Sequence, residues 1–233
     1  MDTVGDRMKP FATIVFVMCI YLSGSDSAGL MQKSVIFPTK TATSFVKLNA
    51  ADFSDLTAFT VCLRAASEEK HNYALFSYAV SGSNNELLIW QKTNAQLDLY
   101  LGSVITGFSL PKMNAWLRHI CVSWESQNGE ITVWVNGGRS LRKVSSKGGV
   151  VKNGGQFFIG QEQDSVGGKF DIEQSFVGEM TDVNMWDRVL KPYEIELISQ
   201  GCYSDGGNII DWGSTTFTQE GKVIIKDNND CTL

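Results

Sequence analysis

A candidate calcium loop spans residues 160–174, which read Gly-Gln-Glu-Gln-Asp-Ser-Val-Gly-Gly-Lys-Phe-Asp-Ile-Glu-Gln. Four carboxylates and three side-chain amides surround a Gly-Gly pair. Ca²⁺ takes six to eight oxygen ligands from carboxylates, amides and backbone carbonyls, and flexible loops let these groups converge. Acidic residues beside glycine are also typical of a solvated surface loop, and the EF-hand spacing is absent. The hypothesis of a calcium site in this segment needs support from the rest of the chain.

Residues suited to catalysis are poorly arranged. A glycoside hydrolase needs two carboxylates flanking a cleft, but Glu125 and Glu130 are separated by Asn128-Gly129, which is typical of a hairpin turn. His71 lies in a polar segment, and His119 has no serine elbow or nucleophile motif beside it. We therefore do not expect an enzyme.

The N-terminus has the pattern of a secretory signal peptide. Arg7 and Lys9 precede an apolar run at 11–22 and a small, polar stretch at 23–29. The apolar run is shorter than the ~20 residues that a membrane span requires. We assign residues 1–28 to the signal peptide and 29–233 to one secreted, extracellular domain with no membrane span.

Charge and cysteine content narrow the class of protein. The formal net charge is -5, and no basic patch interleaved with aromatic residues is present, so specific nucleic-acid binding is not expected. After the leader the cysteines are Cys62, Cys121, Cys202 and Cys231. In an oxidising compartment an even number of cysteines indicates disulfides, and four cysteines allow three pairings.

Short alternating segments predict an all-β fold. Apolar and polar residues alternate at 59–63, 97–101 and 131–135, which favours half-buried antiparallel strands. The third segment is followed by Asn-Gly-Gly at 136–138, which favours a tight hairpin. Frequent turns between short strands indicate a flattened β-sandwich or jelly roll.

One helix and one late strand complete the predicted fold. The helix is expected from Lys191-Pro192 to Gly201, with Tyr193, Leu197 and Ile198 on the side that faces a sheet. The tail contains Val-Ile-Ile at 223–225, for which we expect one closing strand.

Residues 119–126 read His-Ile-Cys-Val-Ser-Trp-Glu-Ser. This resembles the signature His-x-Cys-x-Ser/Thr-Trp-x-Ser of the pentraxins, with Phe-Thr-Val-Cys-Leu upstream at 59–63 and Val-Asn-Met-Trp-Asp downstream at 183–187. The resemblance covers nearly the whole chain after the leader. It implies a jelly roll with one long helix across one face, a Cys62–Cys121 disulfide, a cyclic homopentamer and two adjacent Ca²⁺ ions.

The resemblance also implies the calcium ligands. In the family pattern the middle residue of the Glu-Gln-Asp triplet binds through its backbone carbonyl, and the acid and amide after the Gly-Gly pair bind the second, more loosely held ion. The matching residues here are Asn84, Asn85, Glu162, Gln163, Asp164, Asp171 and Gln174. The family usually has Asp-Asn where this chain has Asn84-Asn85, and often Glu where it has Asp171, so we expect weakened calcium binding.

A charge count then indicates the ligand class. Two Ca²⁺ ions bring +4, and Glu162, Asp164 and Asp171 bring -3, which leaves +1. Anionic oxygens would fill the open coordination positions. We expect calcium-dependent, lectin-like pattern recognition of phosphate-bearing ligands (phosphocholine, phosphoethanolamine) or acidic saccharides on microbial or damaged-cell surfaces. The resemblance places this role in innate immunity and the acute phase, with complement as a possible partner.

Two aromatic residues are candidate ligand contacts. Trp90 occupies the position of the aromatic residue that packs on choline in phosphocholine-binding pentraxins, and Trp suits cation–π contact. Tyr100 occupies a position where a small residue usually opens the pocket, and Ile105 replaces the glutamate that caps the choline amine. Selectivity for phosphocholine is therefore open.

One disulfide pairing and the class of protein still have alternatives at this point. Cys202 and Cys231 are predicted to bond to each other, and the alternative is a bridge between subunits. A laminin-G-like adhesion module also combines a sandwich with calcium at a loop rim, and a jelly-roll glycoside hydrolase is a third possibility.

Overall fold

The computed structural model describes residues 29–201 and 206–228 of the 233-residue chain. The expected signal peptide at 1–28 lies outside the described residues, and so do Cys202 and Cys231.

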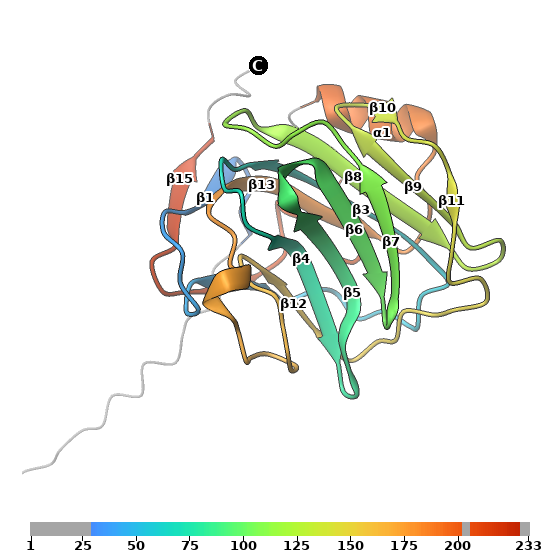
Figure 1. Ribbon diagram of the computed structural model, residues 1–233, viewed down its shortest axis with the longest axis horizontal. Helices are drawn as coiled ribbons and strands as arrows, with labels where there is room; N and C mark the ends of the chain where they lie inside the picture. Colours follow the sequence, from blue (N-terminus) through green and yellow to red (C-terminus); the bar gives the residue numbers. More distant parts are fainter. Residues whose placement is uncertain (1–28, 202–205, 229–233) are drawn as a thin grey trace, which may run out of the picture.

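Two antiparallel sheets form the fold (Figure 1). The seven-stranded sheet has the order β14 (Phe217–Glu220), β2 (Phe45–Leu48), β12 (Gln156–Ile159), β4 (Tyr73–Val80), β5 (Ser83–Lys92), β6 (Gln96–Leu101) and β7 (Val104–Ser109). The eight-stranded sheet has the order β10 (Gly138–Arg139), β9 (Glu130–Val135), β8 (Arg118–Glu125), β3 (Ala58–Ala66), β13 (Gly178–Trp186), β1 (Lys33–Phe37) and β15 (Ile224–Asp227), with β11 (Lys143–Val144) also paired to β9. The predicted all-β sandwich is confirmed.

The alternation seen in the sequence becomes the two faces of each strand. The segments at 59–63, 97–101 and 131–135 lie in β3, β6 and β9. Phe59, Val61 and Leu63 of β3 join Leu87 and Ile89 of β5 in the main core between the sheets. The turn after β9 has positive φ at Asn136 (49°) and Gly137 (79°), as a tight hairpin requires.

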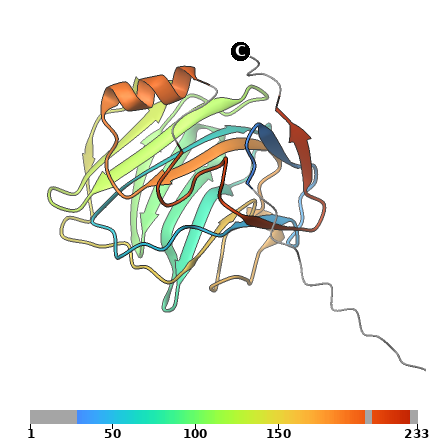
Figure 2. The same cartoon turned by 180° about the vertical axis from the view of Figure 1, so that it is seen from behind.

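A second, smaller core lies on the outer face of the eight-stranded sheet. Cys62 of β3 and Cys121 of β8 are directly opposite each other and form a disulfide, as the resemblance implies. Helix α1 (Pro192–Gln200) covers this face through Ile195 and the partly buried Ile198. In both ribbon views α1 lies along the outer side of this sheet (Figure 1, Figure 2).

The predicted contact face of this helix is wrong for two of three residues. Tyr193 and Leu197 are 57% and 64% exposed. Residues three apart on a helix lie on one face, so Ile195 and Ile198 contact the sheet together and turn the other two outward. The helix lies across one face as predicted, but it has only nine residues.

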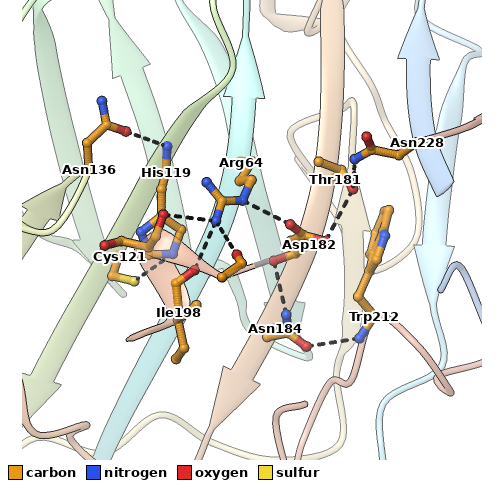
Figure 3. A network of polar contacts seen from close by, with 12 residues as sticks. Arg64, His119, Cys121, Asn136, Thr181, Asp182, Asn184, Ile198, Trp212 and Asn228 are labelled. Carbon is orange, nitrogen blue, oxygen red and sulfur yellow. Dashed lines mark hydrogen bonds and ion pairs between the residues drawn. The ribbon is translucent and has the colours of Figure 1, made fainter. Parts of the chain in front are cut away.

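Arg64 anchors the C-terminal end of α1 to the sheet (Figure 3). Its Nη2 donates to the carbonyls of Ile198 (2.9 Å) and Gly201 (2.8 Å), and its Nε donates to Asp182 Oδ2 (2.9 Å). The last carbonyls of a helix have no partner within the helix, and the guanidinium donates to carbonyls at this end of α1.

The predicted closing strand of the tail is confirmed as β15, at the edge of the eight-stranded sheet. A second strand, β14, was not predicted and lies in the seven-stranded sheet. β14 pairs with β2, and β15 pairs with β1. A bend at residues 221–222 separates the two strands. Between α1 and β14, Trp212 is buried and its Nε1 donates to Lys33 O at 3.0 Å.

Other smaller elements are the 3-10 turns η1 (Thr93–Ala95) and η2 (Ile172–Gln174). None of the helices in the described part of the chain is long and apolar enough to cross a membrane.

Arg64→Met should lower the free energy of unfolding by about 2–4 kcal/mol, because Asp182 and the helix carbonyls lose a charged donor in a partly buried site. Urea unfolding at neutral pH measures the change. The control is Lys33→Met, which removes an exposed pair with Asp227 and should cost less than ~1 kcal/mol. Equal losses in the two variants would contradict the proposed anchoring of α1.

Candidate metal centre

The candidate calcium loop connects β12 to β13 and is closed at its neck. Phe176 N–H donates to Gly160 O at 3.0 Å. Gly160 has φ 92°, and a Cβ at this position would lie 2.2 Å from the ring of Phe37. Glycine is therefore required where the loop leaves the sandwich, and the core holds both ends of the loop.

Gln163 fixes the first half of the loop to the seven-stranded sheet. Its fully buried side chain donates from Nε2 to Ser77 O (3.2 Å) and Gln156 O (2.9 Å), and its Oε1 accepts from Gly167 N–H (2.9 Å). Because the side-chain amide is already engaged, the group that Gln163 can offer to a metal is its backbone carbonyl. This agrees with the role implied by the resemblance.

Glu162 carries a buried carboxylate next to other acidic groups. It is 3% exposed, and its Oε2 has no hydrogen-bond partner within the described residues. Burial, followed by the nearby charge of Asp164, raises the pKa of Glu162 to about 7; Asp171 adds to the rise, and a hydrogen bond with the Asn85 side chain opposes it. The structure therefore brings all three predicted segments, around Asn85, Glu162 and Asp171, close to each other.

Four buried oxygens from these three segments lack a donor. They are Asn85 Oδ1, Gln161 Oε1, Glu162 Oε2 and Gln174 Oε1, none of which has a hydrogen-bond partner in the part of the chain described. Asn85, Glu162 and Gln174 are the predicted ligands among them. A buried polar atom without a partner is costly. Carboxylate and amide oxygens are the ligands that Ca²⁺ prefers, so the residues present fit this ion.

The remaining predicted ligands are Asn84, Asp164 and Asp171, and the charges of Asp164 and Asp171 act on Glu162. Asn84 Nδ2 lies 3.5 Å from Asp164 Oδ1, and both residues line an open pocket of about 460 Å³ beside the β4–β5 turn. Asp171 caps η2 by accepting from Glu173 N–H at 2.9 Å, whereas the Glu173 carboxylate pairs with Lys40 at 2.6 Å. Glu173 is thus engaged elsewhere, in keeping with its omission from the predicted ligands.

The carboxylates are spread more widely than the ligands of one ion. Among described residues, the only Cys, His, Asp and Glu side chains that bring three ligand atoms within 4.8 Å of each other are Cys62, His119 and Cys121. That group is no metal site, because both sulfur atoms belong to the disulfide. Burial lowers the pKa of His119 to about 3, which makes it a neutral structural residue.

Apolar side chains adjoin the candidate centre on the outer face of the seven-stranded sheet. Trp90 packs with Ala74, Leu88 and the partly buried Tyr100, and only 8% of Trp90 is exposed. Tyr100 lies opposite Leu88 on one side and the exposed Ile105 on the other. Burial, then Asp98 and Glu162, raise the pKa of Tyr100, so its phenol lies near the centre. Tyr100 is more accessible than Trp90.

The weak catalytic candidates are engaged in ordinary contacts. Both carboxylate oxygens of Glu125 accept from Asn128 N–H at 3.1 Å, within the hairpin turn. Glu130 pairs with Arg142 at 2.7 Å. The two half-buried acids are thus engaged with separate partners.

Sequence reasoning missed the residues that hold the loop in place. Ser77 belongs to β4, far from the loop in sequence, and Gln156 begins β12, the strand that leads into the loop. Both accept hydrogen bonds from Gln163 at their backbone carbonyls. Gln161 is fully buried and donates to Thr41 O (2.6 Å) and Ser44 O (2.9 Å). No local pattern distinguishes such partners, because backbone carbonyls are the same for every residue.

Comparisons with known proteins identify the family. The sequence model of the Pentaxin family matches residues 33–227. The chain is 40% identical to the C-reactive protein of Cavia porcellus over 92% of this chain and 97% of that protein. It is 38% identical to the serum amyloid P-component of the same animal over 91% and 95% of the two chains. The heptameric SAP-like pentraxin of Limulus polyphemus has a similar fold (TM-score 0.75, 26% identity, 89% of this chain and 100% of that chain).

The chain belongs to the pentraxin family. This supports a pattern-recognition role in innate immunity and a non-enzymatic function, and it sets aside the laminin-G and glycoside-hydrolase alternatives. Pentraxins generally bind calcium, and C-reactive protein and serum amyloid P-component are secreted plasma proteins. Oligomerisation is supported by the multimeric relative from Limulus polyphemus.

The raised pKa of Glu162 predicts a pH-dependent stability in the calcium-free protein. A buried carboxyl of this kind favours the folded state while protonated, so its contribution is complete below its ordinary pKa of 4.5 and is lost as pH rises through about 7. Glu162→Gln should therefore gain up to about 3 kcal/mol relative to the unsubstituted protein between pH 4.5 and pH 8.

Urea unfolding in chelator at several pH values measures this difference. Glu173→Gln is the matched control, because Glu173 is exposed and pairs with Lys40. A constant difference between Glu162→Gln and the unsubstituted protein across the pH range would contradict the burial of an unpaired carboxylate.

Proposed function

We propose that this chain is a secreted pattern-recognition protein that binds anionic ligands through two Ca²⁺ ions on each subunit of a ring-shaped oligomer, a homopentamer. The observation that carries the proposal is the set of donor-free, buried oxygens of Asn85, Glu162 and Gln174, which come from three segments far apart in sequence. Two bound cations, the first at Asn85 and Glu162 and the second at Gln174, would supply the partners that these oxygens lack.

The proposed ligands are those expected from the sequence. Oxygens of Asn84 and Asn85, the carboxylates of Glu162 and Asp164 and the carbonyl of Gln163 would hold the first ion, and Asp171 and Gln174 would contribute to the second. When bound, the ions supply open coordination positions for an oxygen ligand. The sum of +4 from two ions and -3 from Glu162, Asp164 and Asp171 leaves +1, which favours phosphate or carboxylate.

The surface around the ions supports a preference among anionic ligands. Tyr100 and Ile105 form an apolar surface with a phenolic hydroxyl beside Glu162, and Trp90 supports it from below. A quaternary amine would meet Ile105 instead of a carboxylate. We therefore propose phosphate-bearing ligands such as phosphoethanolamine, or acidic saccharides, ahead of phosphocholine.

Two complementary surfaces support a ring. One is an acidic groove of about 380 Å³ at the ends of β1, β3 and β13, with Glu68, Glu69 and Glu179 in its lining. The other is the basic hairpin segment, residues 138–147, which carries Arg139, Arg142 and Lys147. The hairpin segment lies at the far edge of the eight-stranded sheet from β1 (Figure 1).

Different surfaces that meet between identical copies form a heterologous interface, which closes into a ring when the rotation allows. Leu141 and Val144 are exposed apolar residues in the hairpin segment and would be covered there. A ring places weak sites on one face, so that they act together on repetitive surfaces. Complement recruitment would depend on this assembly.

Calcium titration by calorimetry tests the metal centre. We expect two ions per subunit in the unsubstituted protein, a loss of at least tenfold in calcium affinity in Glu162→Gln, and a change below twofold in Glu173→Gln, since loss of a charged ligand weakens calcium binding. On a glycan and phospholipid array, binding to acidic ligands should disappear in chelator. Binding that survives in chelator would contradict the role of calcium.

Leu141→Asp should weaken ring assembly, because it places a charge in an interface that would otherwise bury a leucine. Light scattering in calcium is expected to show smaller species than for the unsubstituted protein. Val104→Asp, at an exposed apolar residue of β7, is the control and should leave the ring intact. A monomeric unsubstituted protein would contradict the proposed ring.

A further inference from the structure

The segment that carries Asp171 and Gln174 is held by a residue outside the proposed ligands. His71 lies in the loop between β3 and β4, and its Nε2 is 2.9 Å from the carbonyl oxygen of Ser175. Its Nδ1 is 3.0 Å from Glu69 Oε2. The imidazole thus bridges two chain segments that are more than 100 residues apart in sequence.

The direction of the contact to Ser175 is fixed by chemistry. A backbone carbonyl can only accept, so His71 Nε2 carries the hydrogen and donates it. The ring itself packs edge-on against Tyr73 (5.8 Å between centroids), and Tyr73 packs against Phe176 (5.3 Å). His71 is therefore held by the same aromatic side chains that hold the neck of the loop.

Ser175 connects this contact to η2. It is buried, its Oγ donates to Ile172 O at 2.8 Å, and the same Oγ accepts from Thr41 N–H at 3.3 Å. Its own N–H also donates to Ile172 O. Because Ser175 directly follows Gln174 and closes the turn that Asp171 caps, a fixed Ser175 carbonyl fixes the position of both proposed ligands.

We propose that His71 is a positioning residue for the second calcium ion. The His71 side chain holds the 171–175 segment in its ligating conformation before the ion binds. This inference rests on the proposed function, since it assigns Asp171 and Gln174 to that ion. A segment that is already ordered loses less conformational entropy on binding. The effect should therefore be confined to the second, weaker binding step.

Two variants at this position separate the contact to Ser175 from the contact to Glu69. The amide nitrogen of His71→Gln can reach the place of Nε2 and still donate to Ser175 O, whereas that of His71→Asn reaches only the place of Nδ1. We expect His71→Asn to weaken the second calcium step by about three- to tenfold, the range for loss of one hydrogen bond, and to change the first step less than twofold. His71→Gln should remain within about twofold of the unsubstituted protein in both steps.

Amide hydrogen exchange without calcium gives a second readout. Residues 171–176 should exchange about three- to tenfold faster in His71→Asn than in His71→Gln. Lys40→Gln is the control on the same segment, because it removes only the exposed pair with Glu173, and it should change calcium affinity less than twofold.

The positioning role would be overturned if His71→Asn and His71→Gln had the same second-step calcium affinity and the same exchange rates, whether or not these differ from the unsubstituted protein. It would also be overturned if His71→Asn weakened both calcium steps equally. If the unsubstituted protein binds no calcium, the proposed function fails on its own, and hydrogen exchange still decides whether His71 holds the segment.

Discussion

The buried side-chain amide of Gln163 is the interaction on which the candidate metal centre depends. It satisfies backbone groups of β4 and β12 and, through Gly167, the turn of the loop itself. With the neck closed between Gly160 and Phe176, the loop cannot move away from the sheet without leaving several buried polar groups unpaired. The oxygens of Asn85, Glu162 and Gln174 stay buried without a donor because the hydrogen bonds around the loop offset the free-energy cost of leaving them unpaired.

The two outer faces of the sandwich differ in the contacts that their polar groups make. Under α1, Arg64 pairs with Asp182 and with carbonyls at the end of the helix (Figure 3). The disulfide there lies among apolar side chains. Near the candidate centre, burial and the neighbouring charges of Asp164 and Asp171 raise the pKa of Glu162. A closed face gives stability, whereas the face with unsatisfied oxygens has the chemistry to bind a cation, and through it an anion.

Local patterns succeeded where one period of alternation or one turn decides the structure. Strand β3 follows from the alternation of Phe59, Val61 and Leu63, and the hairpin after β9 follows from Asn136-Gly137. The same reasoning failed for α1, because a short helix offers several possible apolar faces and the position of Cys62, Trp134 and Trp186 on the sheet selects the one with Ile195. In the tail it found β15 from the apolar run at 223–225 but missed β14, which joins the other sheet.

The sequence by itself determined the class of this protein and the identity of the candidate ligands, since residue types, their spacing and a family signature are all linear properties. Only the tertiary structure decided which oxygens lack a donor, that Trp90 is covered while Tyr100 is partly exposed, and that Ser77 and His71 hold the loop from distant segments. The physical reason is that burial and hydrogen bonding depend on which atoms meet in space. Such contacts often involve backbone groups, and these carry no signature in the sequence.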